Sequence, residues 1–177
     1  VGIHSHELSS SLTKGAIYPN GTKVSNPFLL GASIVYKTPM FVKFQIGVDM
    51  KLKNAFAHPY LEQIGREGQI EFASADCHML VMANIFGAPF SLDLFCGPVF
   101  SKPLGQDKYL NYPIDGGAWG LMAGLSTEIP LGKGYMVFQE GFLFDLTYFS
   151  ADVDGAAIEL MKRRDAIMSI GYSFKLF

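Results

Sequence analysis

Apolar and polar side chains alternate along residues 40–53, MFVKFQIGVDMKLK, and do so strictly from Val42. The even positions from Val42 to Leu52 are apolar, whereas the odd positions from Lys43 to Lys53 are charged, polar or glycine. A period of two indicates a β-strand, because successive side chains of a strand point to opposite faces. The segment is longer than the roughly 5–6 residues of an average strand and fits the about 9–11 residues of a membrane-crossing strand. We therefore expect lipid on its apolar face and a barrel interior on its polar face.

Eight strand candidates can be identified along the chain, the first of them weak, polar and rich in serine. They are His4–Lys14, Phe28–Lys37, Met40–Lys53, Gly68–Phe86, Phe90–Ser101, Gly117–Pro130, Tyr135–Phe149 and Arg164–Phe177. Their connections alternate between short turns, at Thr38-Pro39, Gly87–Pro89 and Leu131–Gly134, and four segments of about 12–15 residues. Short periplasmic turns and longer outside loops are typical of outer-membrane barrels. The predicted fold is all-β: an eight-stranded antiparallel up-and-down transmembrane β-barrel, with both termini at the short-turn end.

Aromatic residues gather where the predicted strands end, as in the interfacial girdles of membrane barrels. Near the short turns these are Tyr36, Phe41, Phe86, Phe90 and Tyr135, and near the long connections they are Phe28, Tyr112, Trp119, Tyr148 and Phe149.

Composition agrees with this interpretation. Hydrophobic residues make up 49% of the 177 residues, yet no apolar run approaches the roughly 18–20 residues of a transmembrane helix. The length suggests one domain, residues 1–177. A net charge of −2 argues against a nucleic-acid surface, which needs a basic patch. Val1 is not followed by a signal sequence, so we expect that a signal peptide was removed.

Two positions disturb the alternation. Glu71 shares the parity of Cys77, and a bulge between Phe72 and Ala75 would restore the pattern. Glu140 falls on the apolar face of its strand near mid-membrane, where a charge facing lipid costs on the order of 2–4 kcal/mol for the worst residue types and less for acids. We therefore expect a bulge near Gly141 that turns Glu140 inward.

The two cysteines lie on adjacent predicted strands. With the turn centred between Ala88 and Pro89, Cys77 lies opposite position 100 and Cys96 opposite position 81. That offset is too large for a disulfide, so we expect free thiols.

The interior of an eight-stranded barrel is only wide enough for side chains or one small ligand. The charged residues assigned to it are Lys43, Asp49, Lys51, Lys53, Asp76, His78, Asp93, Glu128, Glu140, Asp145 and Lys175. Because buried charges must be paired, we expect an internal network of ion pairs and hydrogen bonds. The alternative is a narrow aqueous or ligand path through the lumen.

Catalytic and metal sites find little support. Ser74, Asp76 and His78 are spaced by two and share one strand face, but this spacing alone does not make a nucleophile, base and orienting acid. His4 and His6 share a face without a third ligand nearby. We expect no enzyme activity, no metal and no cofactor.

Residues 156–164, AAIELMKRR, form a short charged amphipathic stretch. It could be a loop helix or an extension of the last strand beyond the membrane. Lys162, Arg163 and Arg164 would then lie near the outer lipid headgroups, whose phosphates attract cations, but the default expectation is a solvated charge run.

The C-terminus carries a family resemblance. Ser169-x-Gly171-x-x-Phe174-x-Leu176, followed by Phe177, resembles the β-signal of outer-membrane barrels. The whole chain resembles the small eight-stranded barrels of the OmpX, OmpA-barrel and OmpW types, and Gly-Ala-Trp-Gly at 117–120 looks most OmpW-like. The resemblance implies a monomer in a bacterial outer membrane that contacts outer-membrane lipid and, through its last strand, the barrel-insertion machinery.

The predicted role is structural or surface-interacting, with the outside loops as the working part. One alternative is OmpW-like passage of small, hydrophobic solutes. The other is a soluble lipocalin-like barrel that binds a lipophile. The latter reverses the alternation, with polar residues outside and apolar residues inside.

Overall fold

The computed structural model describes residues 2–10, 28–57, 69–87, 90–104, 114–153 and 156–175. Its strands are β1 (Gly2–Ser10), β2 (Phe28–Lys37), β3 (Val42–Ala57), β4 (Gln69–Phe86), β5 (Ser91–Leu104), β6 (Ile114–Gly116), β7 (Ala118–Leu131), β8 (Gly134–Asp145), β9 (Phe149–Val153), β10 (Ala156–Met161) and β11 (Arg164–Lys175). Within these ranges no helix is long and apolar enough to cross a membrane.

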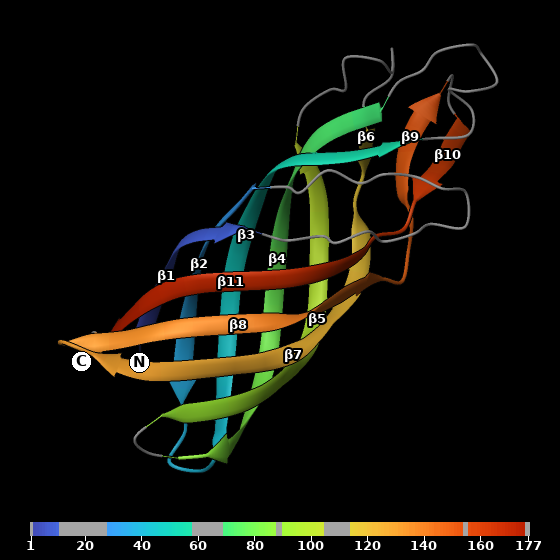
Figure 1. Cartoon of the computed structure of the whole chain (residues 1–177). Coiled ribbons are helices and arrows are strands. Elements are labelled where there is room, and N and C mark those ends of the chain that lie inside the picture. The colour runs from blue at the N-terminus through green and yellow to red at the C-terminus, as the bar shows by residue number, and fades with distance from the viewer. Residues whose placement is uncertain are drawn as a thin grey trace.

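Eight strands close into an antiparallel barrel in the order β1-β11-β8-β7-β5-β4-β3-β2 (Figure 1). The barrel closes because β1 pairs with both β2 and β11. Phe174 of β11 lies opposite Gly134, next to a short turn, so β11 ends at the short-turn end. The predicted eight-stranded fold is confirmed.

The largest difference from the predicted strands lies after β8. The strand expected over residues 135–149 ends at Asp145, because the backbone N–H groups of Leu146 and Thr147 both donate to the carbonyl of Trp119. Phe149 then begins β9, which pairs with β10 on one side and β6 on the other. These three strands form a separate small sheet at the loop end (Figure 1). The segment around residues 156–161 is therefore neither a helix nor an extension of β11.

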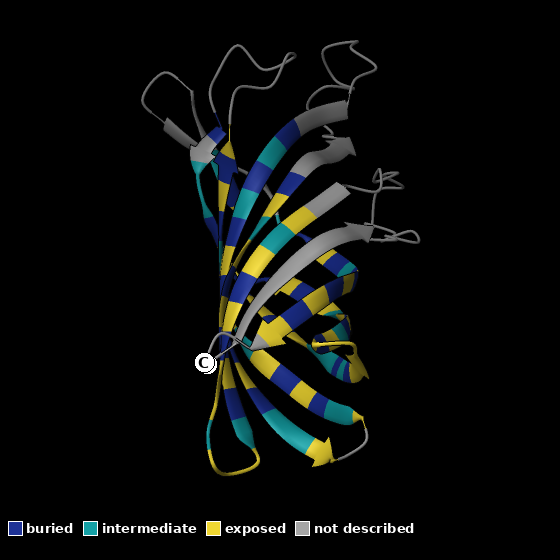
Figure 2. Ribbon diagram, turned by 90° about the vertical axis from the view of Figure 1, so that its left-hand side faces the viewer, coloured by how far each residue is buried: buried dark blue, intermediate teal, exposed yellow. Residues whose placement is uncertain are grey.

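Exposed and buried positions alternate along the barrel strands (Figure 2). On β3, Phe44 and Ile46 are exposed, whereas Lys43 and Gln45 are buried. The wall thus presents large apolar side chains outward and polar ones inward, which is the pattern of a membrane-spanning barrel. It is the reverse of the pattern of a soluble lipocalin-like barrel.

Most of the predicted girdle residues with described side chains lie on the outer face. These exposed aromatics are Tyr36, Phe41, Phe86, Phe90, Trp119, Tyr135 and Tyr148. Phe149 is an exception: it is buried and its ring packs 5.4 Å from that of Phe72, because β9 leaves the barrel wall. The predicted outward position of Phe149 is wrong. Phe28 and Tyr112 fall outside the described side chains.

The register of β4 and β5 agrees with the expected cysteine positions. Cys77 pairs with Phe100, and Cys96 pairs with Val81. Both cysteines are free thiols on the exposed face. Both predictions are confirmed.

The bulge expected on β4 lies on the neighbouring strand instead. The register between β3 and β4 shifts between Lys51, which is opposite Ser74, and Asn54, which is opposite Phe72. Two residues of β3 therefore face one residue of β4, whereas the pairing of β4 with β5 is regular over residues 73–78. The bulge predicted between Phe72 and Ala75 of β4 is therefore wrong, because the extra residue lies on β3.

A pair of glycines lets the wall approach an interior aromatic ring. Gly124 of β7 pairs with Gly141 of β8. A Cβ atom at position 124 would lie 2.1 Å from the carbonyl oxygen of Glu140 and 2.8 Å from the ring of Phe95. No side chain fits there without movement of the backbone.

Gly124→Ala is expected to destabilise the barrel by about 1–3 kcal/mol, because overpacking displaces backbone and ring together. Urea unfolding in detergent micelles, followed by fluorescence of Trp119, the single tryptophan, measures this change. Gly87→Ala is the matched control, since a Cβ atom there would have nothing within 4 Å. Equal stability of the two variants would contradict this account of the glycine pair.

Candidate functional site: the barrel interior

Two groups of ion pairs lie inside the barrel, one toward each end. We define the turn-end cluster as Lys37, Lys43, Asp93 and Glu128. Lys43 Nζ lies 2.5 Å from Asp93 Oδ2 and 3.3 Å from Glu128 Oε1. Lys37 Nζ lies 2.7 Å from Glu128 Oε2. Each carboxylate therefore faces a lysine, and Asn84 Nδ2 also donates to Asp93 Oδ1 at 2.8 Å.

The loop-end cluster consists of Lys51, Asp76, Asp145, Arg163 and Asp165. Arg163 is almost fully buried, and its Nε donates to Asp145 Oδ2 at 2.9 Å. Its Nη1 lies 3.3 Å from Asp76, and its Nη2 donates to the hydroxyl of Ser101. Lys51 Nζ lies 3.1 Å from Asp76 Oδ2 and 2.9 Å from Asp165 Oδ2. Two cations thus bind three carboxylates in a site shielded from water, where single charges would be costly.

Neutral hydrogen bonds connect the wall between the two clusters. Gln139 Nε2 donates to Gln45 Oε1 at 3.0 Å, and Gln45 Nε2 donates to Ser33 Oγ at 3.1 Å. His78 lies beside them: its Nε2 is 3.4 Å from Gln45 Nε2, and its Nδ1 is 3.2 Å from Asp49 Oδ2.

An apolar cluster fills another part of the lumen between the ion pairs. We call this set the apolar lumen layer: Leu80, Met82, Phe95, Val99, Met122, Leu143 and Ile167. Along β4, Leu80 and Met82 lie between Asp76 and Asn84. Along β5, Phe95 and Val99 lie between Asp93 and Ser101. The lumen therefore contains an apolar region bounded by charge at both ends.

Three of these contacts join strands on opposite sides of the closed strand order. Lys37–Glu128 joins β2 to β7 at the turn end, and Gln45–Gln139 joins β3 to β8 near the middle. Arg163, directly before β11, reaches Asp76 of β4 at the loop end. Each contact spans the full width of the interior, so side chains cross the lumen at three heights.

Most of the charged residues assigned to the interior lie in these contacts. The structure brings Lys43, Lys51, Asp76, Asp93, Glu128 and Asp145 into the two clusters, and His78 and Asp49 into the region between them. The side chains of Lys53 and Lys175 lie outside the described part of the chain. Of the predicted insertion signal, Ser169 and Gly171 are buried and Phe174 is exposed, whereas Leu176 and Phe177 lie outside the described residues.

The inward position predicted for Glu140 is wrong. The pairings of β8 with β7 and with β11 run through Glu140 without a register shift, so no bulge forms near Gly141. Glu140 keeps the parity of its exposed neighbours Phe138 and Phe142 and faces outward. Gly141 instead faces inward, beside Phe95.

Arg163 was expected in a solvated charge run or near the outer headgroups, and both positions are wrong because its side chain is buried. Arg163 and Asp165 share the parity of Ser169 and Ser173, which are buried in the interior. Extending that alternation backward from the last strand would have found both residues. Lys162 stays outside, 4.5 Å from the ring of Tyr148. Arg164 is exposed, in keeping with its parity.

Among the described residues, Ser74, Asp76 and His78 share the inner face of β4 but do not form a catalytic triad. Ser74 Oγ donates to Asp76 Oδ1 at 3.4 Å, but Asp76 is bound by Lys51 and Arg163. The contacts of His78 are with Gln45 and Asp49. Ser74 and Asp76 therefore contact each other, but His78 contacts Gln45 and Asp49 instead, so the three residues do not form the relay that acyl-transfer chemistry requires.

Arg163→Gln is expected to destabilise the barrel by about 3–5 kcal/mol, because Asp76 and Asp145 lose their shared cation while remaining buried. Urea unfolding of the refolded protein in micelles measures the loss. Arg164→Gln, which changes the exposed neighbour, should cost far less. Similar losses of unfolding free energy in the two variants would show that the buried ion pairs do not stabilise the loop end of the barrel.

Solved structures with this fold include two outer-membrane proteins. The solution structure of the E. coli Outer Membrane Protein W aligns with a TM-score of 0.57 at 11% identity, covering 99% of this chain and 96% of that chain. The solid-state structure of outer membrane protein AlkL in DMPC lipid bilayers aligns with a TM-score of 0.55 at 12% identity, covering 98% and 88%. No protein-family model and no curated protein matches the sequence. The chain thus has the eight-stranded barrel fold of these outer-membrane proteins.

Proposed function

We propose that this protein is a structural barrel of a bacterial outer membrane whose loop end carries a surface-interaction role. The observation that supports it best is the set of three contacts across the full lumen, at Lys37–Glu128, Gln45–Gln139 and Arg163–Asp76. An interior crossed by paired side chains stabilises the barrel and leaves little room for bulk water. This favours a scaffold over an open pore.

The outer face supports the proposed location. Exposed apolar residues line β3, β4, β7 and β8, including Ile46, Met79 and Phe142, each more than half exposed. Aromatic side chains lie at both ends of this apolar band. A soluble barrel would hold such residues inside, whereas lipid contact explains their exposure.

The loop end supports the proposed working surface. β3 and β4 are the longest strands, at 16 and 18 residues, against 12 for β8. At the same end of the molecule, β6, β9 and β10 form the small sheet outside the barrel (Figure 1). A rigid scaffold that carries loops at one end is a common way to present binding residues.

Insertion is proposed to use the last strand. β11 pairs with β8 and β1, so its docking closes the barrel. Ser169, Gly171, Phe174, Leu176 and Phe177 carry the resemblance to the β-signal. The insertion machinery and outer-membrane lipid are the partners that this resemblance favours.

Passage of small hydrophobic solutes is a second candidate, supported by the apolar lumen layer. Such a path would run past Phe95 and Leu143 and would require the ion pairs at each end to separate.

Refolded in detergent micelles, the protein should migrate differently on a denaturing gel before and after boiling, because a closed barrel resists the detergent until heated. In planar bilayers, the same preparation should show no steady conductance steps, because side chains bridge the lumen at three heights.

Two outcomes would contradict the proposal separately. A protein that folds without detergent and shows no shift on boiling would exclude the membrane barrel. Steady conductance, or entry of a small hydrophobic reporter into liposomes that depends on the protein, would replace the structural role with passage.

A further inference from the structure

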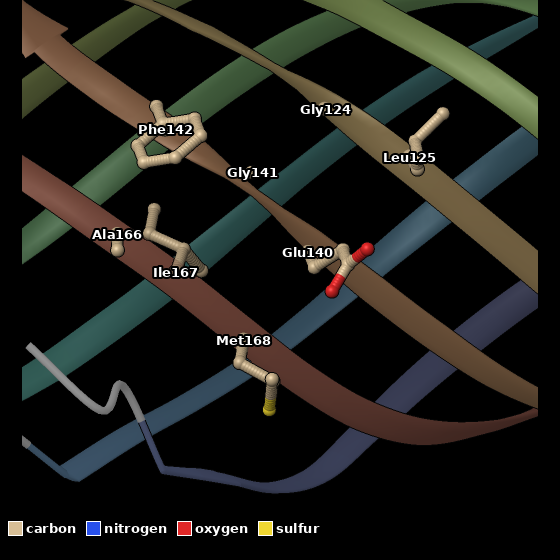
Figure 3. A pocket seen from close by; sticks show the side chains of 8 residues that line it. All are labelled: Gly124, Leu125, Glu140, Gly141, Phe142, Ala166, Ile167 and Met168. Atoms are coloured by element: carbon tan, nitrogen blue, oxygen red, sulfur yellow. The ribbon is translucent and has the colours of Figure 1, made fainter.

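Glu140 is a carboxylate on the lipid-facing wall without a partner in the described part of the chain. It pairs in register with Leu125 on β7 and Met168 on β11. Phe138 and Phe142 flank it on the same face of β8. Neither a hydrogen bond nor an ion pair from another described residue reaches its side chain. An apolar setting thus surrounds one acidic group (Figure 3).

The position of Glu140 along the barrel axis is unusual for an acidic residue. β8 runs from Gly134 to Asp145, so Glu140 lies near the middle of the strand and hence near the middle of the bilayer. Charges that face hydrocarbon are disfavoured, and those retained usually serve a function with a specific partner. The other acidic residues with described side chains face the interior and lie beside a basic partner there; they are Asp49, Asp76, Asp93, Glu128, Asp145 and Asp165.

The wall is hollowed beside Glu140. A groove of about 350 Å³ runs along β7, β8 and β11, where Ala166 contributes only a methyl group between Phe142 and Met168 (Figure 3). A second groove of about 300 Å³ lies on the side of Phe138 and Thr127. Both grooves are lined by Leu125, Glu140 and Met168. The carboxylate therefore lies where a mainly apolar hollow meets a second one that Thr127, Gln139 and Ser169 also line.

We propose that this groove binds a long-chain aliphatic amine taken from the membrane, with its ammonium group on Glu140. The apolar walls suit a hydrocarbon chain, and the unpaired carboxylate selects a cation. An anionic amphiphile would be repelled, and a neutral one would gain no ion pair.

The volume of the two grooves and the depth of Glu140 in the membrane further restrict the class of ligand. The two hollows have the volume of small-molecule sites, which begin near roughly 300 Å³. A stable protein partner would need about 800 Å² of surface on each side. The amine of a phospholipid headgroup is tied to the membrane surface by the phosphate, whereas a single-chain amine can enter the hydrocarbon in its uncharged form and so reach the middle of the wall. The inference rests on the proposed membrane location and not on the surface role of the loops.

The test uses the whole chain in nanodiscs of phosphatidylcholine, with ¹³C-methyl-labelled methionine, titrated with dodecylamine. The Met168 methyl group should shift saturably. Met50 and Met79, exposed on β3 and β4, report amine that merely dissolves in the bilayer and should not follow the same curve. Dodecanol, with the same chain and no charge, should bind at least tenfold more weakly.

Two variants separate charge from shape. Glu140→Gln should weaken dodecylamine binding at least tenfold while leaving the dodecanol response unchanged. Ala166→Leu fills the hollow and should weaken both. Leu94→Gln places the same amide on the exposed face of β5 and should leave dodecylamine binding as in the wild type.

Several results would overturn the inference. Parallel shifts of all three methionines, or equal binding of amine and alcohol, would show partitioning only. A Met168 shift that depends on protein-to-lipid ratio without amine would assign the groove to a second copy of the chain. A protein that shows no gel shift on boiling would contradict the proposed function. A folded barrel that does not bind dodecylamine would contradict only this inference.

Discussion

The need to pair every backbone N–H and C=O group inside a bilayer is the constraint on which the rest of this structure depends. Lipid offers no hydrogen-bond partners, so a spanning sheet must close on itself. Closure here relies on β1, which pairs with both β2 and β11. Once the sheet is closed, the two faces of every strand meet different surroundings. The period of two then sets which side chains meet lipid and which are enclosed.

Different kinds of side chain fill the interior at different heights along the barrel axis. Ion pairs occupy both ends of the lumen, where Lys43 and Arg163 each bind two carboxylates. The apolar lumen layer lies between them, and the glycine pair at 124 and 141 admits the ring of Phe95. Buried ion pairs are weak evidence for net stability, since their desolvation offsets their attraction. Their contribution here is to hold opposite strands at one separation, which suits a scaffold.

The alternation and the turns predicted the barrel, its strands and the cysteine register, because a period of two and short hairpins are local signals. The misplaced features depend on neighbouring strands. The bulge lies on β3 and not on β4, since either strand can absorb the extra residue. Glu140 faces outward because unbroken pairing on both sides outweighs the preference of one charge. Arg163 turns inward because it continues the inward parity of β11 and binds Asp76 and Asp145 there; the parity is visible in the sequence, whereas the two carboxylate partners come from distant segments.

The most direct test of this account is a spin-label scan of β3 in lipid bilayers, with Cys77 and Cys96 replaced by alanine. Labels at Phe44, Ile46 and Val48, one at a time, report collisions with oxygen, which concentrates in lipid, and with a water-soluble nickel chelate. We predict high oxygen accessibility and low nickel accessibility at all three positions, with oxygen accessibility rising toward the middle of the bilayer. Immobile labels that neither reagent reaches would place these side chains in a packed interior and contradict the membrane-spanning barrel.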